Sequence, residues 1–307
     1  MREVIGRGIV MKLVTYNIRF GLGLDQVIDL ARIAETVRDA DIIALQEVER
    51  FWKRSGMSDQ PEIVGRHLEE YYWVYFPAFD MDASERESDG TVVNRRRQFG
   101  PMLLSRWPIR TSRQILLPKL GTVRHFNMDT GGIECVVDAP SGPLRVYSLH
   151  LSAVSTRERL MQIDQLLEIH RNALTNGGAW TGYESVANQD WSNGEALPPM
   201  PQVTVLMGDF NSEPESPEYN RLVGDIDPCN GRVGHLDGFV DSWTTAKKQS
   251  GDPITWWPDP PDCSPGHGLR LDYCFLSAQL GHQVRRASVD SSAQGSDHRP
   301  YWVELDL

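Results

Sequence analysis

The chain has 307 residues of ordinary globular composition, 40% hydrophobic and 24% charged, which excludes a mainly disordered, collagen-like or coiled-coil protein. No run approaches the roughly 18 apolar residues of a membrane-spanning helix, and the N-terminus lacks the apolar core of a signal peptide. The formal net charge is −11, so the protein as a whole lacks the basic footprint of one that binds duplex DNA through its phosphates.

Nine short runs rich in Val, Ile, Leu and Tyr, bounded by Gly, Pro, Asp and Ser, are predicted as strands. In chain order they are 12–17, 41–46, 71–76, 102–104, 132–138, 144–150, 202–207, 271–276 and 301–305. The ordered core is therefore expected to start near residue 11. No repeat or break in composition divides the chain, so residues 1–307 are predicted to form a single domain.

Three helices are predicted between these strands. The first, with Asp25 as its N-cap, is indicated by apolar residues at helical spacing, namely Val27, Leu30, Ala31, Ala34 and Val37. The second spans about 155–174, because Ser155 and Glu158 fit a capping box. The third starts at Ser216, with Pro217 at the first helical position. Many strands and few helices, without regular βαβ alternation, favour a layered α+β sandwich.

Three segments between these elements have an unusual composition. Residues 175–200 carry Gly, Asn, Trp and Pro without periodicity, so this inserted loop is either a lid over a site or an insertion without substrate contact. Residues 80–94 are polar and expected to be mobile. Residues 95–125 hold eight Lys or Arg and no acid. That segment is either a solvated strand edge or a positive wall facing an anionic substrate.

The cysteines, Cys135, Cys229, Cys263 and Cys274, form no Cys-x-x-Cys pair, which excludes a zinc knuckle or a thiol redox motif. Cys135 and Cys274 lie in apolar runs and are predicted to be buried thiols. Free thiols and the missing signal peptide together predict a cytoplasmic protein. No obligate protein partner is evident from the sequence.

Polar side chains collect at the ends of the predicted strands. Four strands end in such groups, and two others begin with them. The groups are Asn17, Glu47, His150, the pair Asp209 and Asn211, Asp272, and the pair Asp297 and His298. If the last two strands run antiparallel to the first four, all six groups meet on one rim. Each group alone has an ordinary explanation as a turn residue, but the combination is hard to obtain by chance.

These residue types suit one kind of chemistry. Carboxylate and amide oxygens are ligands for Mg²⁺ or Mn²⁺ rather than for zinc or copper. Such an ion polarises a phosphoryl oxygen and orients a water. A carboxylate can deprotonate that water, and a His beside an Asp can support a phosphoryl oxygen. The sequence contains no nucleophile elbow, Walker loop or dinucleotide-binding fingerprint that would compete with this interpretation.

Seven blocks resemble the endonuclease/exonuclease/phosphatase superfamily, which includes deoxyribonuclease I, exonuclease III-like repair enzymes, neutral sphingomyelinases and inositol phosphatases. They occur in the family's order and span residues 12–307. The blocks are Thr15-Tyr16-Asn17-Ile18-Arg19, Leu45-Gln46-Glu47-Val48, Gly100-Pro101-Met102-Leu103-Leu104-Ser105-Arg106, Ser148-Leu149-His150-Leu151, Gly208-Asp209-Phe210-Asn211, Arg270-Leu271-Asp272-Tyr273 and Ser296-Asp297-His298-Arg299-Pro300. Gly208–Asn211 and Ser296–His298 are the most specific.

The resemblance implies a four-layered α/β/β/α sandwich of two packed, mostly antiparallel sheets, with the site at one end. It also implies a role for each matching residue. Glu47 resembles the main metal ligand and Asn17 its companion, while Asp297 supports metal or water. Asp209 resembles the group that activates water, and Asn211 the one that binds the scissile phosphate. His298 resembles the phosphate-contacting histidine, Asp272 the acid that orients it, and His150 a second histidine of deoxyribonuclease-like and sphingomyelinase-like members.

Two departures bear on the substrate. Arg19 stands where repair nucleases carry an acid, and His150 where they place a Tyr, so abasic-site repair is disfavoured. The sequence therefore predicts a Mg²⁺-dependent phosphoesterase that hydrolyses a phosphodiester, small or lipid-linked, by metal-assisted attack of water. The alternative is a metal-dependent nuclease acting on DNA or RNA, supported by residues 95–125 and the deoxyribonuclease-like block 17–19. A non-catalytic binding module is disfavoured, because no site residue is missing. Four tryptophans could pack or contact substrate: Trp180, Trp191, Trp256 and Trp257.

Overall fold

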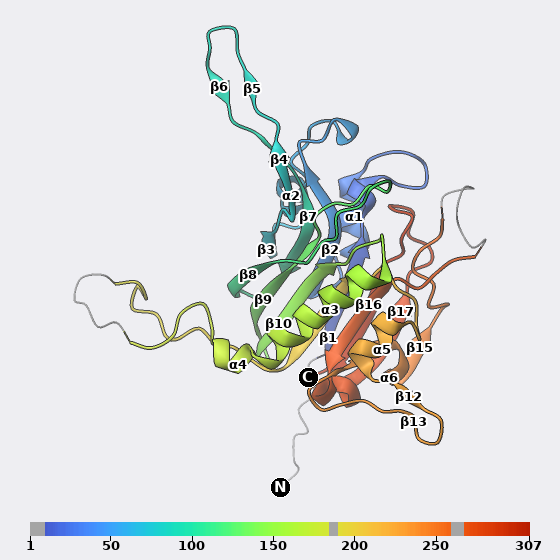
Figure 1. Cartoon of the computed structure of the whole chain (residues 1–307). Coiled ribbons are helices and arrows are strands. Elements are labelled where there is room, and N and C mark those ends of the chain that lie inside the picture. The colour runs from blue at the N-terminus through green and yellow to red at the C-terminus, as the bar shows by residue number, and fades with distance from the viewer. Residues whose placement is uncertain (1–9, 184–189, 259–266) are drawn as a thin grey trace.

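The computed structural model describes residues 10–183, 190–258 and 267–307, and shows two β-sheets lying face to face between two layers of helices (Figure 1). The first sheet has eight strands, and β1 and β2 lie beside each other near its centre. In spatial order its strands are β15 (Lys248–Ser250), β17 (Val284–Val289), β18 (Tyr301–Asp306), β1 (Val10–Asn17), β2 (Ile42–Arg50), β7 (Arg96–Ser105) and β3 (Tyr72–Tyr75), and β4 (Phe79–Asp82) pairs with β7.

The second sheet has six strands, with β11 and β10 near its centre. In spatial order its strands are β14 (Phe239–Asp241), β16 (Asp272–Ser277), β11 (Thr204–Asp209), β10 (Gly142–His150), β9 (Gly131–Ala139) and β8 (Ile109–Leu116). Pairing is parallel between β1 and β2, β10 and β11, and β15 and β17, and antiparallel between the other neighbours.

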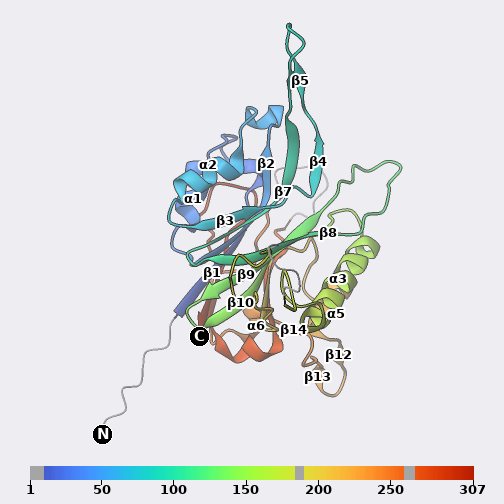
Figure 2. The same cartoon turned by 90° about the vertical axis from the view of Figure 1, so that its left-hand side faces the viewer.

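The helices cover the outer faces of the two sheets. Figure 2 shows α1 (Leu30–Val37) and α2 (Gln60–His67) on one side, and α3 (Thr156–Arg171) and α5 (Pro217–Val223) on the other. The short helices are α4 (Ala173–Asn176) and α6 (Ser242–Thr245), with 3₁₀ turns η1 (Arg19–Gly21), η2 (Lys53–Ser55) and η3 (Ala278–Gln283). The predicted α+β, four-layered α/β/β/α sandwich is confirmed.

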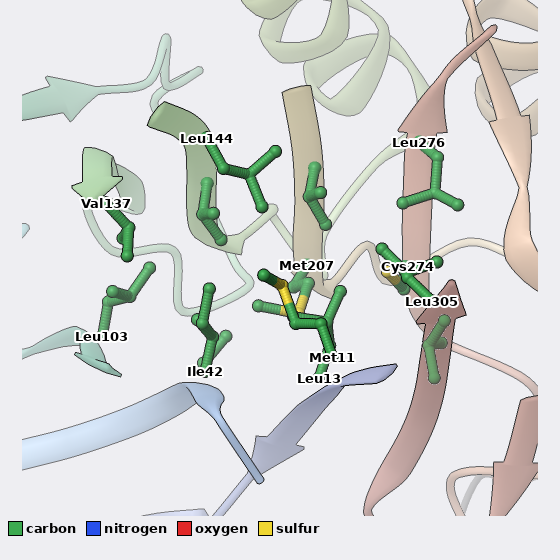
Figure 3. Packing of buried hydrophobic residues seen from close by; sticks show 14 of the residues in the cluster. Met11, Leu13, Ile42, Leu103, Val137, Leu144, Met207, Cys274, Leu276 and Leu305 are labelled. Atoms are coloured by element: carbon green, nitrogen blue, oxygen red, sulfur yellow. The ribbon is translucent and has the colours of Figure 1, made fainter. Parts of the chain in front are cut away.

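Three apolar layers hold the sandwich together, and the alternation of side chains along the strands places neighbouring core residues in different layers. Between the sheets, Figure 3 shows Met11, Leu13, Ile42 and Leu103 of the first sheet facing Val137, Leu144, Met207 and Leu276 of the second. The next residues along β1 and β2, such as Val14 and Ile43, pack against α1 and α2 instead. Tyr147 and Leu149 of β10 likewise pack against α3 and α5.

The predicted helices form, with one correction at each of the first two. The N-cap of α1 is Asp29 and not Asp25, and the Asp29 side chain accepts from Arg32 N. Gln26 takes a left-handed φ of 62° and the chain folds back on Leu22 before the helix starts. The Asp25 carboxylate instead accepts from Val27 N and pairs with Arg32. The third helix has Ser216 as its N-cap and Pro217 in its first turn, as predicted.

The second predicted helix is shorter than expected and only half of its capping box forms. Ser155 Oγ accepts from Glu158 N, but the Glu158 carboxylate accepts from Leu120 N and Asn127 Nδ2 of the loop before β9. The helix ends at Arg171, and Asn172 separates it from α4. Glu158 therefore ties the segment before β9 to the N-terminal turn of α3.

Residues 80–94, expected to be polar and mobile, contain strands of a β-ribbon that the sequence did not indicate. Its base is β4 paired with β7, and farther out β5 (Glu85–Arg86) pairs with β6 (Val92–Val93). In both Figures 1 and 2 this ribbon projects away from the sandwich. Polar composition hid the strands, because both faces of a projecting ribbon are solvated and no apolar alternation marks it. The small pair β12 (Ile226–Asp227) and β13 (Gly231–Arg232) was hidden in the same way.

Candidate active site

Strand direction brings the predicted polar groups to one end of the sandwich. In the second sheet, His150 of β10 lies beside Asp209 of parallel β11, and Asp209 lies opposite Asp272 of antiparallel β16. In the first sheet, β18 runs antiparallel to β1 while β2 runs parallel to it, so Asn17 and Glu47 reach the same end. The predicted directions of the strands are thus confirmed.

The Asp209 carboxylate lies at the centre of the cluster and is almost fully buried. Its Oδ1 accepts from the backbone N–H of Asn211 at 2.9 Å, and its Oδ2 accepts from Asn17 Nδ2 at 3.0 Å. The Nε2 atoms of His150 and His298 each lie 3.7 Å from Oδ2. This carboxylate is therefore fixed in orientation and flanked by two imidazoles.

Asn17 joins the two sheets at this point. Its Nδ2 donates to Glu47 Oε1 as well as to Asp209 Oδ2, both at 3.0 Å. Its Oδ1 accepts from Arg19 N at 3.1 Å. The amide nitrogen, and not the oxygen expected of a metal ligand, thus faces the carboxylates, and this one NH₂ group donates to both Glu47 and Asp209.

Two of the candidate residues have strained backbones. Glu47 has φ of 60° at an irregularity between Leu45 and Val48, where β2 and β7 change register. Asn211 has φ of 48°. A left-handed conformation is rare for a residue with a side chain, costs about 1–3 kcal/mol, and clusters at functional sites. The bulge interrupts the pairing of β2 with β7 at the residue whose side chain lines the site, and the pairing resumes at Val48.

His298 and Asp272 form a buried pair behind the Asp209 carboxylate, with His298 Nδ1 and Asp272 Oδ2 2.8 Å apart. Thr255 Oγ1 accepts from the backbone N–H of Asp272. Burial disfavours the imidazolium, but the carboxylates of Asp272, Asp209 and Asp297 outweigh it and raise the pKa of His298 to about 10. Burial raises the pKa of Asp272 to about 6, although His298 opposes this. At neutral pH the pair is therefore an imidazolium beside a carboxylate.

Asp297 lies at the edge of the cluster and is held by its neighbours. Its Oδ2 accepts from Trp256 Nε1 at 3.3 Å and lies 3.8 Å from Arg19 Nε. Its Oδ1 accepts from Ser296 Oγ. These contacts neutralise the carboxylate in part, so Asp297 is a poorer candidate ligand than Glu47.

A cavity of about 610 Å³ opens over the cluster. Glu47, His150, Asp209, Asn211, Asp297 and His298 line it, whereas Asn17 and Asp272 are buried and absent from its lining. The rest of its wall is largely apolar and aromatic. This part is made by Trp52, Phe99, Phe126, Met128, Leu151, Ala153, Val154, Trp256, Leu269 and Leu271, together with Arg54, Asn127 and Thr130. Of the four tryptophans considered from the sequence, Trp256 alone is among these lining residues.

Sequence reasoning missed the aromatic wall and Arg54. The signal was present, since Phe51-Trp52-Lys53-Arg54 follows directly on the strand that carries Glu47. Phe99 lies in β7, next to β2, and its ring lies 6.3 Å from that of His150. Aromatic residues just beyond a strand end share the rim with the polar groups at that end.

The donor set fits a hard divalent cation. The carboxylates of Glu47 and Asp209 converge on the single NH₂ group of Asn17, which is a position where a cation could replace it. Ligand atoms of Asp209, Asp272 and His298 also lie within 4.8 Å of one another. In that trio His298 Nδ1 and Asp272 Oδ2 are already paired with each other at 2.8 Å.

The two surface segments singled out from the sequence lie elsewhere. No described residue of 175–200 lines the cavity, and residues 184–189 lie outside the described chain. The loop leaves from the far end of α3, about 24 Å along the helix from the cavity residues that precede it. In residues 95–125, six of the eight cations pair with carboxylates and none lines the cavity. The pairs are Arg95–Glu85, Arg96–Asp80, Arg106–Asp41, Arg110–Asp138, Arg113–Glu134 and Lys119–Asp129.

Cys135 and Cys274 are buried free thiols, as predicted, and burial raises the pKa of both. Cys229 is exposed, and Cys263 lies outside the described residues. Within the part of the chain that the structure describes, no helix is both long enough and apolar enough to span a membrane.

Comparisons with known proteins agree with this fold. The family model described as "Endonuclease/Exonuclease/phosphatase family" matches residues 14–298. The mannosyl-6-phosphatase Bt3783 of Bacteroides thetaiotaomicron superimposes with a TM-score of 0.64 at 17% identity, over 97% of this chain and 100% of the other. A family protein from Leptotrichia buccalis gives 0.61 at 18%, over 97% and 100%. Beta toxin 275-280 of Staphylococcus aureus gives 0.57 at 16%, over 95% and 99%. No curated protein matches the sequence.

Proposed function

Because this chain belongs to the endonuclease/exonuclease/phosphatase family, we propose that it is a Mg²⁺-dependent hydrolase of a phosphodiester, either a small molecule or a lipid headgroup. One observation carries the proposal. A fixed carboxylate, that of Asp209, has two imidazole nitrogens at 3.7 Å and the Glu47 carboxylate across a shared amide, all at a cavity large enough for a substrate. Mn²⁺ is the second candidate ion.

The phosphate is bound by His298 and Asn211 in this proposal. The Nδ1–H of the His298 imidazolium donates to Asp272, so its Nε2–H is left to donate to a phosphoryl oxygen near Asp209. Asn211 Nδ2 donates to the carbonyl of Leu151, which fixes the amide at the cavity wall. Donors held in place before the substrate arrives need no reorganisation as charge develops on the phosphoryl oxygens.

Asp209 orients the attacking water and receives its proton. The oxygen of that water bonds to phosphorus as the ester P–O bond breaks, and the alkoxide that leaves takes up a proton, so that the one received by Asp209 can return to it or to solvent; the products are a phosphomonoester and an alcohol. His150, on the other side of Asp209 Oδ2, is placed to hydrogen-bond a second phosphoryl oxygen or the departing alkoxide. Proton transfer to a positioned carboxylate contributes about 10²–10⁴-fold to such reactions.

Glu47 would hold the divalent ion, together with the Oδ2 side of Asp209 once the Asn17 amide has moved aside. When bound, the ion supplies Lewis-acid polarisation of the phosphoryl oxygen and compensates negative charge. The left-handed backbone at Glu47 supports this role, because the strain serves to aim one side chain into the cavity. Asp297 is a supporting ligand only if it releases Trp256 and Arg19.

A substrate panel tests the proposal. The purified protein is assayed with bis(4-nitrophenyl) phosphate, 4-nitrophenyl phosphate, a phosphocholine lipid and plasmid DNA, each with Mg²⁺ and with EDTA. The expected result is Mg²⁺-dependent cleavage of the aryl diester or the lipid. This activity should be lost in Asp209→Asn and kept in His282→Gln, a control variant at an exposed residue of η3 that does not line the cavity. Preference for the monoester, or activity unchanged by EDTA, contradicts it.

Plasmid nicking as the strongest activity would instead favour the nuclease alternative. The ion pairs of residues 95–125 weaken the nuclease alternative. Six of the eight cations are paired with carboxylates, so the segment forms no continuous positive surface at the cavity. A cytoplasmic location and the absence of an obligate protein partner remain predictions of the sequence.

A further inference from the structure

Arg54 is an unexplained charge in the candidate site. It lies in η2, just after β2, and among the described residues that line the cavity it is the sole Lys or Arg. The other charged groups of that lining are the carboxylates of Glu47, Asp209 and Asp297, and the imidazolium of His298. Arg54 is therefore the one cationic side chain, besides His298, that the described lining offers to an anionic part of a substrate.

The guanidinium of Arg54 is held by a buried carboxylate. Its Nε and Nη2 both donate to Glu49 Oε2, at 3.0 and 2.7 Å. The Glu49 side chain is fully buried, whereas 44% of the Arg54 side chain is exposed. Burial raises the pKa of Glu49, although Arg54 opposes this. An arginine fixed by a carboxylate with no exposure of its own is not a mobile surface charge.

Aromatic rings hold the same guanidinium from its faces. Its central carbon lies 4.1 Å from the ring centroid of Phe20, 4.4 Å from that of Trp52 and 5.9 Å from that of Phe99. Cation–π contacts of this kind are worth about 0.5–2 kcal/mol each. The Phe99 ring also lies 6.3 Å from the ring of His150, so one aromatic ring neighbours both Arg54 and the hydrolytic centre.

These contacts leave one edge of Arg54 available. Its Nε and Nη2 are taken by Glu49 and its faces by rings, while Nη1 has no hydrogen bond to any residue in the described part of the chain. The exposed part of the side chain lines the cavity. A donor already fixed in place loses little conformational entropy on binding, so its charge-assisted hydrogen bond contributes more to affinity.

We propose that Arg54 forms a second anion-binding position, in which its Nη1 edge binds an additional phosphate carried by the substrate, one aromatic ring away from the phosphate that is hydrolysed. This inference rests on the proposed function, because it identifies the substrate class of the same site. The substrate class is a phosphodiester that bears a further phosphate group. Either a nucleotide or a phosphorylated lipid headgroup provides this chemistry.

Binding measurements test the position without requiring turnover. Isothermal titration calorimetry in Mg²⁺ compares two matched ligand pairs: thymidine 5′-phosphate with thymidine 3′,5′-bisphosphate, and inositol 1-phosphate with inositol 1,4-bisphosphate. Wild type is expected to bind the bisphosphate at least tenfold more tightly in one pair, and that pair identifies the source of the second phosphate. Arg54→Gln should lose the preference while its affinity for the monophosphate stays within twofold. Arg54→Lys should keep part of it.

Arg97 provides the matched control, because it also lies over the Trp52 ring, at 5.2 Å, but does not line the cavity. Arg97→Gln should keep the full preference. Equal affinity of the wild-type protein for both members of both pairs would refute the second anion-binding position. An equal loss of monophosphate and bisphosphate binding in Arg54→Gln would show that Arg54 only stabilises the fold through Glu49. Tight, Arg54-dependent bisphosphate binding by a protein that cleaves no diester would instead refute the proposed function and the substrate class, and leave only the second anion-binding position standing.

Discussion

Asp272 both orients the His298 ring and stabilises its positive charge, and replacing Asp272 by Asn separates these two roles. The amide keeps the size of the carboxylate and can still accept from Nδ1–H, so the ring stays oriented. What it loses is the negative charge that stabilises the imidazolium. If His298 acts as a cationic donor to phosphate, the variant should bind and cleave substrate only at a pH where the ring still carries its proton.

The size of the effect follows from the distance. His298 Nδ1 and Asp272 Oδ2 are 2.8 Å apart, and two charges centred about 4 Å apart at an effective dielectric of about 20 attract by about 4 kcal/mol. At about 1.4 kcal/mol per pH unit, that is close to three pH units. The pKa of His298, raised to about 10 in the native protein, should therefore fall to about 7 in Asp272→Asn.

The direction of the pH dependence follows from the active form of His298, which is the protonated ring. In the native protein the ring stays protonated up to about pH 10, so the rate should hold through neutral pH and fall only in strong alkali. In the variant the same fall should occur near pH 7. The rate at pH 6 should then be far closer to that of the native protein than the rate at pH 9.

Two measurements check this. The imidazole signals of metal-free protein, followed by NMR against pH and assigned with His298→Gln, give the pKa directly. The pH dependence of kcat/KM on an aryl phosphodiester gives its consequence. Asp138→Asn, which removes a carboxylate paired with Arg110 outside the cavity, serves as the control. An unshifted His298 titration in Asp272→Asn would refute the reasoning, whatever happened to the rate.

Three further predictions concern catalysis, stability against pH and the core. Asp209→Asn should lower kcat at least 100-fold, the low end for a lost proton acceptor, with a melting temperature within a few degrees of the native value; near-native turnover would contradict its role. Burial and Arg145 lower the pKa of His170 to about 4, so the unfolded chain takes up a proton near pH 6.5 and the native protein does not. From pH 7 to 5 the native protein should therefore lose about 1–2 kcal/mol of stability relative to His170→Gln, which urea titrations of both proteins at both pH values measure; an equal change in the two proteins would contradict the assignment. Leu103→Ala, in the layer between the sheets, should cost about 2–5 kcal/mol in the same titrations, and a loss below 1 kcal/mol would mean that the sheets close over the gap.

Much of the fold could be predicted because its signals are local. Strands buried on both sides, such as β2 and β11, appear as short apolar runs, and the caps at Ser155 and Ser216 lie within three residues of the N–H groups that they accept from. The polar residues of the site follow directly on such strands, so their convergence depended only on strand direction. Strand direction was the assumption on which the whole site prediction rested.

Local patterns failed where the partner of a residue lies far along the chain. The positive segment 95–125 looks unpaired in sequence because its carboxylates, such as Asp80 for Arg96, come from neighbouring strands or loops. Helix α2 was missed because its polar residues and Pro61 show no apolar stripe. Asp25 lost the N-cap position to Asp29 because the chain folds back first.

The sequence by itself determined which side chains reach the rim of the sandwich, because residue type and strand end are properties of a few neighbouring positions. Only the tertiary structure decided how they meet. Asn17 and Asp209 are 192 positions apart and come from different sheets, so their contact depends on how the sheets pack and on every register between them. The same packing turned Arg54, an ordinary charged residue in sequence, into a cation held by Glu49 and three aromatic rings beside the hydrolytic centre.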